Sequence, residues 1–219
     1  MNLEWDKLYK LGTDVAGFLF FHPARLAHRK DDPTGWWGDD FAEEFRAGRL
    51  VAFCTGSDGT FTLKFVRRPL TPAEERVLVA KESFRYDVRD GRLYWDNANC
   101  LPCEDRFENA EDDENGWLEL PNGPYRLTVH ALDWFSIPDA DREAEADISH
   151  YVVRFEPVSS LEDIPVLKEL PWLLASKSWH EKRVAQQSAS PEADPGATAE
   201  GGRDAASGKF TVARRGRRC

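Results

Sequence analysis

The sequence has neither an excess of positive charge nor a long apolar segment. Its 219 residues include 29 Lys and Arg against 39 Asp and Glu, a formal net charge of −10. Nucleic-acid binding and docking on anionic lipid both favour a basic face, so the charge argues against these two functions for the main part of the chain. The longest apolar run, residues 17–21, has the length of a strand, whereas a membrane-spanning helix needs about 20 residues.

A recognisable secretory signal is also missing. Residues 1–6 (MNLEWD) show no basic region followed by an apolar one. The chain has four cysteines, and cysteines without a signal peptide are typical of a reducing compartment rather than of a disulfide framework. We therefore expect a cytoplasmic protein.

Familiar catalytic and nucleotide-binding motifs are absent from the sequence. It contains no G-x-G-x-x-G, P-loop, G-x-S-x-G or H-E-x-x-H. The acidic run at 104–114 does not fit an EF-hand loop, because Asn122 stands where a bidentate Glu is needed. We predict no catalytic residue and no cofactor, and we favour a protein that is not an enzyme.

Period-two alternation of apolar and polar side chains is the dominant pattern. It predicts half-buried strands at 61–65, 84–88, 125–131 and 151–155, central strands at 16–21 and 50–54, and short strands at 93–95 and 117–120. Turn sequences at 57–59, 90–91 and 121–124 join successive strands tightly, which requires antiparallel neighbours. The predicted fold class is mainly β (α+β): an antiparallel β-sandwich with one or two short helices and a disordered C-terminal tail.

Two short helices are predicted. Thr71 and Glu74 form a capping box with Pro at the first helical position, and the helical spacing continues to Lys81. A second helix is expected at 39–47, ended by Gly48, with Phe41 and Phe45 facing the core. Its acidic residues are expected to decorate the first turn, where the helix dipole favours them. They are Asp39, Asp40, Glu43 and Glu44.

The charge is distributed unevenly along the chain. Residues 1–178 carry 21 Lys and Arg against 34 Asp and Glu, a net −13, whereas residues 179–219 carry 8 against 5, a net +3. Residues 186–208 contain hardly any apolar side chain larger than Ala, and such a segment cannot offset the entropy cost of ordering. We predict a single β-rich globular domain at 1–178. A flexible low-complexity tail follows at 179–219, and its Arg-rich end is suited to acidic surfaces.

Cys100 and Cys103 are the candidates for a metal- or thiol-dependent site. Two thiols at this spacing form a reducible disulfide or half of a zinc site. The sequence offers no second C-x-x-C or H-x-x-x-H, and nearby carboxylates raise the pKa of a thiol. An incidental pair in a loop is the favoured interpretation. His130 and His150 are expected in strands that are candidate neighbours, each on the wetter face, where they could form part of a site.

Tryptophan and acidic residues supply the candidates for partner binding. Trp36 and Trp37 follow a loop-like sequence, where Trp stacks on a sugar, anchors an interface or plugs the end of a sandwich. Plugging is the favoured interpretation. An acidic face speeds association with a basic protein. The acidic candidates are Glu104, Asp105, Glu111, Asp112, Asp113 and Glu114.

The order of short motifs between residues 8 and 158 resembles a bacterial family of unknown function. The motifs are LGTD (11–14), FHPARLAHR (21–29), WW (36–37), GSDG (56–59), LTPAEE (70–75), GRLY (91–94), LPCED (101–105), LPNGPYRLTV (120–129) and YVVRF (151–155). This resemblance implies no catalytic residue. More loosely, the P-x-G-x-Y-x-L-x-V strand followed by YVVRF resembles the competence-type nuclease inhibitors, which are small β-sandwiches. That second likeness is a pattern of strands and not of functional residues.

These observations lead to one functional prediction and two alternatives. We predict a non-catalytic acidic binding module, an inhibitor or immunity-type protein that binds a basic protein partner. The alternatives are a metal- or thiol-dependent site at Cys100 and Cys103, and a small-ligand or sugar-binding β-sandwich that uses Trp36 and Trp37.

Overall fold

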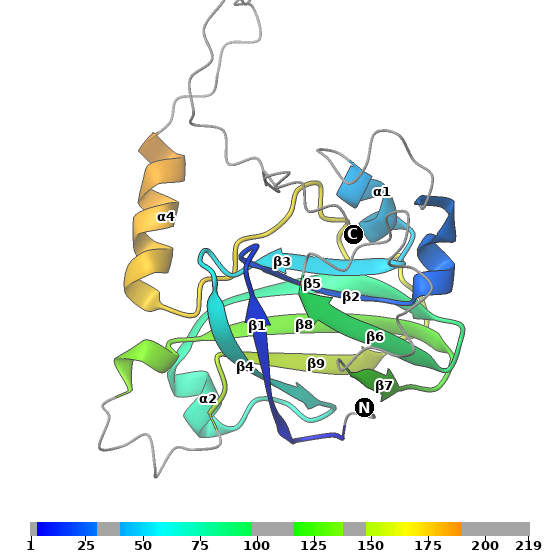
Figure 1. The fold of residues 1–219 in the computed structure, drawn as a ribbon, viewed down its shortest axis with the longest axis horizontal. Coiled ribbons are helices and arrows are strands. Elements are labelled where there is room, and N and C mark those ends of the chain that lie inside the picture. Colours follow the sequence, from blue (N-terminus) through cyan, green and yellow to red (C-terminus); the bar gives the residue numbers. More distant parts are fainter. Residues whose placement is uncertain (1–3, 30–39, 98–115, 138–147, 190–219) are drawn as a thin grey trace, which may run out of the picture.

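The protein is built from two β-sheets packed face to face (Figure 1). A computed structural model of the chain describes residues 4–29, 40–97, 116–137 and 148–189. The five-stranded sheet has the order β1 (Leu8–Thr13), β4 (Gly59–Val66), β9 (Tyr151–Pro157), β8 (Gly123–Leu132) and β5 (Leu78–Val88). The four-stranded sheet has the order β3 (Leu50–Cys54), β2 (Gly17–Phe21), β6 (Arg92–Asn97) and β7 (Trp117–Glu119).

Neighbouring strands are antiparallel, as the tight turns predicted, with one exception. β4 and β9 pair in parallel, with Leu63 opposite Tyr151. Parallel neighbours need a long crossover, and here the chain between β4 and β9 includes two other strands of the same sheet, β5 and β8. The prediction of a mainly β sandwich is confirmed.

Aromatic side chains fill the space between the sheets. The ring of Phe18 on β2 lies 6.3 Å from that of Tyr151 on β9, and Phe65 on β4 lies 5.2 Å from Trp95 on β6. These four side chains are at most 2% exposed. Rings at such separations stabilise a core beyond the area they bury, so aromatic contacts hold the two sheets together.

The helices are short and lie at the ends of strands. They are the 3-10 helices η1 (Pro23–Arg29) and η3 (Trp134–Ser136) and the α-helices α1 (Asp40–Arg46), α2 (Pro72–Arg76) and α4 (Lys177–Ala189). The capping box of α2 is confirmed, since the Glu74 amide donates to Thr71 Oγ1 at 3.2 Å and the Thr71 amide donates to Glu74 Oε2 at 2.7 Å. The predicted continuation to Lys81 is wrong, because β5 begins at Leu78 and its ladder with β8 overrides the local helical spacing.

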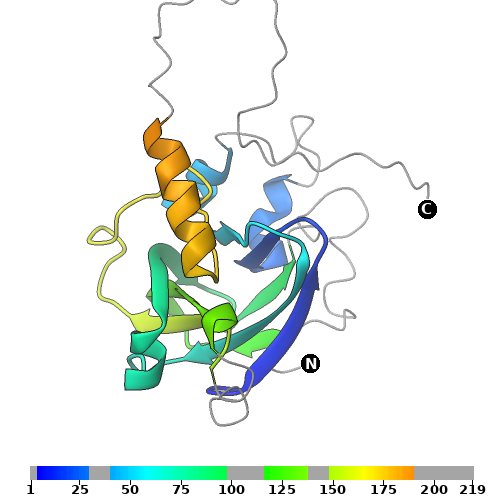
Figure 2. The ribbon, with the colours of Figure 1, turned by 90° about the vertical axis from the view of Figure 1, so that its left-hand side faces the viewer.

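Helix α4 crosses the boundary that the sequence predicted at residue 178. It begins beside η3 (Figures 1 and 2), where the Lys177 amide donates to Asp133 Oδ1 at 3.1 Å. The guanidinium of Arg183 lies 4.3 Å from the ring of Trp172, which precedes the helix. The Arg-rich end at 214–218 lies outside the described residues. No helix within the described ranges is long and apolar enough to cross a membrane.

Candidate functional site

Apart from His130 and His150, every residue that the sequence singled out for chemistry or partner binding lies outside the described ranges. These residues are Trp36, Trp37, Cys100, Cys103, Glu104, Asp105, Glu111, Asp112, Asp113 and Glu114. The structure instead gives the points where their segments, 30–39 and 98–115, leave the sandwich and return to it. The candidate site is therefore built from these attachment points.

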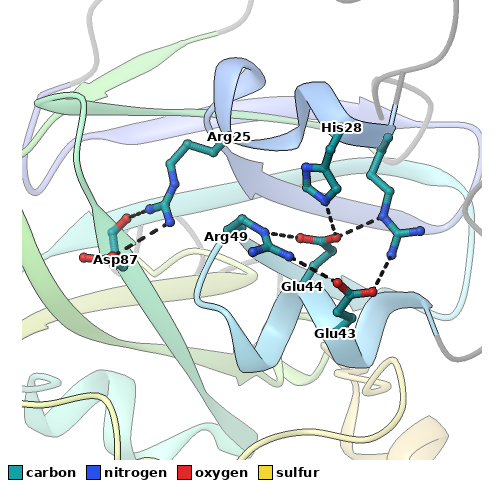
Figure 3. A network of polar contacts seen from close by, with 7 residues as sticks. Arg25, His28, Glu43, Glu44, Arg49 and Asp87 are labelled. Atoms are coloured by element: carbon teal, nitrogen blue, oxygen red, sulfur yellow. Dashed lines mark hydrogen bonds and ion pairs between the residues drawn. The ribbon is translucent and has the colours of Figure 1, made fainter. Parts of the chain in front are cut away.

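A buried carboxylate joins the two ends of segment 30–39 (Figure 3). Glu44, on α1 after the segment, is 0% exposed. Its Oε1 accepts hydrogen bonds from Arg29 Nε at 2.9 Å and from His28 Nε2 at 3.0 Å, both on η1 before the segment. Its Oε2 accepts from Arg49 Nε at 2.5 Å. We call Glu44, His28, Arg29 and Arg49 the Glu44 clamp.

The clamp keeps Glu44 ionised in spite of its burial. Burial alone would raise the pKa of this carboxyl, but the hydrogen bonds from Arg49, Arg29 and His28 hold the pKa below its usual value. The expectation that Glu44 decorates the helix surface is therefore wrong. Glu44 lies between Phe41 and Phe45 on the buried side of α1 because two guanidinium groups and the His28 imidazole donate hydrogen bonds to it. Its neighbour Glu43 is on the surface, with a side chain 64% exposed.

A second contact ties η1 to the five-stranded sheet. Arg25 donates to the carbonyl oxygen of Asp87 on β5, and its Nη2 lies 3.8 Å from Asp87 Oδ2 (Figure 3). The Asp87 amide in turn donates to the Gly48 carbonyl at 2.8 Å. Gly48 has φ +65°, and a Cβ there would lie 3.1 Å from Leu161 Cδ1. The turn after α1 therefore requires glycine, as the sequence predicted.

Segment 98–115 departs near the points that anchor a further segment, 138–147, and it returns to the sandwich beside Trp95. Segment 98–115 follows Asn97, which pairs with Phe18, and the Phe18 ring lies 6.3 Å from that of Tyr151 at the start of β9. Segment 138–147 runs between Ile137 and Ile148, which are 5% and 4% exposed and pack in one apolar cluster. Buried residues thus anchor both ends of segment 138–147 close to where segment 98–115 departs.

These two segments hold most of the excess negative charge, since segment 30–39 has a net −2 and residues 190–219 a net +2, which cancel. The described residues contain 20 Lys and Arg and 20 Asp and Glu, and are therefore neutral. Segments 98–115 and 138–147 together contain 12 acidic and 2 basic residues, a net −10, which equals the net charge of the chain. The sequence prediction attributed negative charge to the body as a whole, and the structure divides that body into a neutral framework and two acidic segments.

His130 and His150 lie on neighbouring strands or at their ends, as predicted, but they are buried and not on a wet face. They are 7% and 5% exposed. His150 Nδ1 accepts a hydrogen bond from the Thr62 amide at 3.0 Å and lies 2.7 Å from Thr62 Oγ1. The Trp134 ring stacks on His150 at 4.5 Å. These contacts assign His150 to the packing under η3.

His130 donates through Nδ1 to the Val152 carbonyl at 3.1 Å. Burial lowers the pKa of this imidazole, and the nearby charges of Lys81 and Arg154 lower it further. The alternation pattern placed His130 on the outward face correctly, but it does not report that neighbouring elements cover that part of the face.

Neither a reactive thiol nor a metal cluster occurs in the described part of the chain. Cys54 is buried, and burial raises its pKa to about 12. No group of three or more His, Cys, Asp or Glu side chains within the described ranges is placed to hold a metal ion. Cys100 and Cys103, the predicted metal candidates, lie outside these ranges.

An open cavity of about 670 Å³ lies among the described residues, at the opposite end of β6 from Asn97. Beside this cavity, the guanidinium of Arg67 lies over the Trp5 ring, 4.2 Å from the ring centroid. The cavity is lined by Glu4, Trp5, Arg67, Gly91, Glu119, Leu120 and Pro121. Its lining combines both signs of charge and contains no nucleophile beside a base, so it has no catalytic arrangement.

The described residues define a class: a two-sheet β-sandwich domain whose framework has no net charge. Within it, residues 6–133 match the sequence pattern of the family of unknown function DUF6386, and the chain belongs to that family. The sequence resemblance to such a family is thereby confirmed; the match covers residues 6–133, and the resemblance was predicted over 8–158.

Two solved structures are similar to the chain. One, described as crocagin biosynthetic gene J, is 19% identical, with a TM-score of 0.44 over 68% of this chain and 95% of that one. The other is ComJ, inhibitor of the DNA degrading activity of NucA, from Bacillus subtilis. It is 14% identical, with a TM-score of 0.41 over 72% of this chain and 99% of that one. No curated protein sequence matches the chain.

Proposed function

We propose that the protein is a non-catalytic binding module of the inhibitor or immunity type. It engages a basic protein partner through its acidic segments, with Glu104, Asp105, Glu111, Asp112, Asp113 and Glu114 as the contact residues. The observation that carries this proposal is the segregation of charge between a neutral framework and two segments of net −10.

Concentrated charge favours this function for a physical reason. A like-charged patch attracts an oppositely charged protein over about a Debye length and raises the association rate by about 10 to 1000 fold at low salt. The same charge repels nucleic acid and acidic proteins, and so selects among partners. Spreading ten charges evenly over a sandwich would produce a weaker local field.

The Glu44 clamp supports a second contact region. It fixes the two ends of segment 30–39, which carries Trp36 and Trp37, against the sheets. Tryptophan side chains supply much of the binding energy at protein interfaces. In the proposed complex the acidic segments set the rate of association, and Trp36 and Trp37 contribute to its lifetime.

The test compares two variants of equal charge. In the first, Glu111→Gln, Asp112→Asn, Asp113→Asn and Glu114→Gln neutralise segment 98–115. In the control, Glu75→Gln, Glu162→Gln, Asp163→Asn and Glu169→Gln remove the same charge from exposed framework positions. The partner is captured with wild-type protein from extracts of the native host, identified by mass spectrometry, and purified. Its association rate is then measured by stopped flow from low to high NaCl.

We expect a basic partner, a rate that falls steeply with salt, and a loss of about tenfold or more at low salt in the first variant. The control should stay within about threefold of wild type at the same salt. An acidic partner, or equal losses in both variants, would refute the proposal.

A further inference from the structure

The outward face of the five-stranded sheet carries a cluster of cationic and hydroxyl side chains. On β8, Tyr125, Leu127 and Val129 point into the core, so Arg126 and Thr128 between them point outward. The register places Arg85 and Ser83 of β5 directly across from Arg126 and Thr128.

β9 extends these rows on the other side of β8. Arg154 lies directly across from Thr128, and Glu156 lies across from Arg126. In the next row, Lys81 of β5 lies across from His130. Side chains directly opposite in an antiparallel pair have Cβ atoms about 5 Å apart. Lys81, Arg126 and Arg154 therefore surround the pair of hydroxyl groups on Ser83 and Thr128.

This arrangement is electrostatically unfavourable without a counter-ion. Arg85 and Arg126 are like charges directly opposed, which destabilises a sheet. Glu156 is the carboxylate of these rows, and its Oε2 lies 3.7 Å from both Arg126 Nη1 and Arg154 Nη2, beyond hydrogen-bond distance. Its one negative charge is shared between two guanidinium groups.

The polar groups of the cluster also have unused hydrogen-bonding capacity. Arg154 Nε is buried and has no hydrogen-bond partner, although the side chain as a whole is 32% exposed. Ser83 Oγ and Thr128 Oγ1 lie 3.1 Å apart, so one of the two hydroxyl protons is engaged and the other is available. Arg85 Nε donates to the Ile164 carbonyl at 2.6 Å. Arg85 therefore contributes positive charge to the cluster but no free hydrogen-bond donor at this atom.

We propose that this cluster is an oxyanion site for a phosphoryl group, held by Arg126, Arg154, Lys81 and the hydroxyl groups of Ser83 and Thr128. A phosphate dianion offers two negative charges and several acceptor oxygens, which match three cations and a hydroxyl donor arranged around a centre. A carboxylate offers one charge and two oxygens in a plane. The ligand is free phosphate or a small phosphate ester, because the net charge of −10 opposes a polyanion.

This site is independent of the proposed function. It lies on the sheet framework and is cationic, whereas the proposed partner site is acidic and borne by segments outside that framework. Either can fail without the other.

Backbone amide chemical shifts in two-dimensional NMR test the proposal with the full chain. Inorganic phosphate is titrated at constant ionic strength and pH, with acetate as the comparison anion. We expect saturable shifts at Ser83, Thr128 and Arg154 with phosphate and weaker, non-saturating shifts with acetate. Phosphoserine is titrated in a second experiment. If it binds more tightly than inorganic phosphate, the ligand of the site is a phosphate ester; if the two bind equally, the ligand is free phosphate.

Variants separate a site from general attraction. Arg126→Gln and Arg154→Gln should each weaken phosphate binding by about tenfold, and Arg154→Lys should restore part of it. The control is Arg89→Gln, an arginine 71% exposed on the same strand region and bound to Asp87, which should leave the affinity unchanged. Linear shifts with phosphate, equal loss in the control, or an oligonucleotide that binds more tightly than phosphoserine would overturn the proposal.

Discussion

Replacing Glu44 by Gln should destabilise the protein strongly, although the Gln side chain has nearly the same shape as that of Glu. The substitution removes the negative charge that Arg29, Arg49 and His28 share, and it directs an amide N–H toward at least one of these donors. Arg29 has a side chain only 6% exposed and would remain a buried charge. Breaking a buried ion pair costs about 3–5 kcal/mol. Because Arg49 and His28 retain contact with solvent, at 24% and 47% exposure, we expect about 3 kcal/mol.

The free energy of unfolding is measured by urea titration, followed by tryptophan fluorescence and circular dichroism. At about 2–4 °C per kcal/mol for a chain of this size, the melting temperature should fall by about 6–12 °C. Glu43→Gln is the matched control, since Glu43 is exposed and its contacts to Arg29 and Arg49 are 3.6 and 3.7 Å, and it should cost about 0.5 kcal/mol or less. A Glu44→Gln protein within about 1 kcal/mol of wild type would refute the reasoning.

Further predictions concern titration, reactivity and capping. The pKa of His130 is lowered by folding, so the unfolded state binds the proton first, and stability should fall as pH drops below about 6.5. Urea midpoints measured from pH 8 to 5 test this, and a His130→Gln protein with an unchanged slope would contradict it. Cys54, with its pKa raised to about 12, should resist alkylation at pH 8 until urea unfolds the chain; peptide mapping that finds it modified in native protein would contradict its burial. Thr71→Ala should cost about 1 kcal/mol through loss of the α2 cap, whereas Thr71→Ser should cost less, and equal costs would argue against capping.

Two kinds of strand could be predicted: the continuously apolar β2 and β3, and the strands whose burial alternates along one segment. The segments at 61–65, 84–88, 125–131 and 151–155 all lie in strands of the five-stranded sheet. β1 was not predicted. Only two of its apolar side chains, Tyr9 and Leu11, pack against the core, and both are only partly buried, so the alternating pattern is too short to recognise. The parallel pairing of β4 with β9 was also not predictable, because local pattern does not report which distant strand lies alongside.

The Glu44 clamp was missed for a related reason. An acidic residue early in a short helix normally faces solvent, and helix dipole and composition both favoured that interpretation. What buries Glu44 is the presence of Arg29 and Arg49 on either side of the helix, and these become neighbours only when η1 and β3 have packed. The signal in the sequence is the position of Glu44 between Phe41 and Phe45, on the apolar stripe of the helix.

The division between a neutral framework and acidic segments has a consequence for how salt acts on the protein. The charges that stabilise the framework, such as those of Glu44 and Glu74, are buried and hydrogen-bonded to arginine, and salt screens buried pairs weakly. The acidic segments contribute mutual repulsion, which salt relaxes. Added salt therefore weakens the proposed association with a basic partner while leaving the fold as stable or more stable. In a protein whose folding and binding relied on the same exposed charges, salt would weaken both together. The segregation of charge allows a neutral framework to belong to a chain of net −10, and in the proposed function that charge attracts the partner.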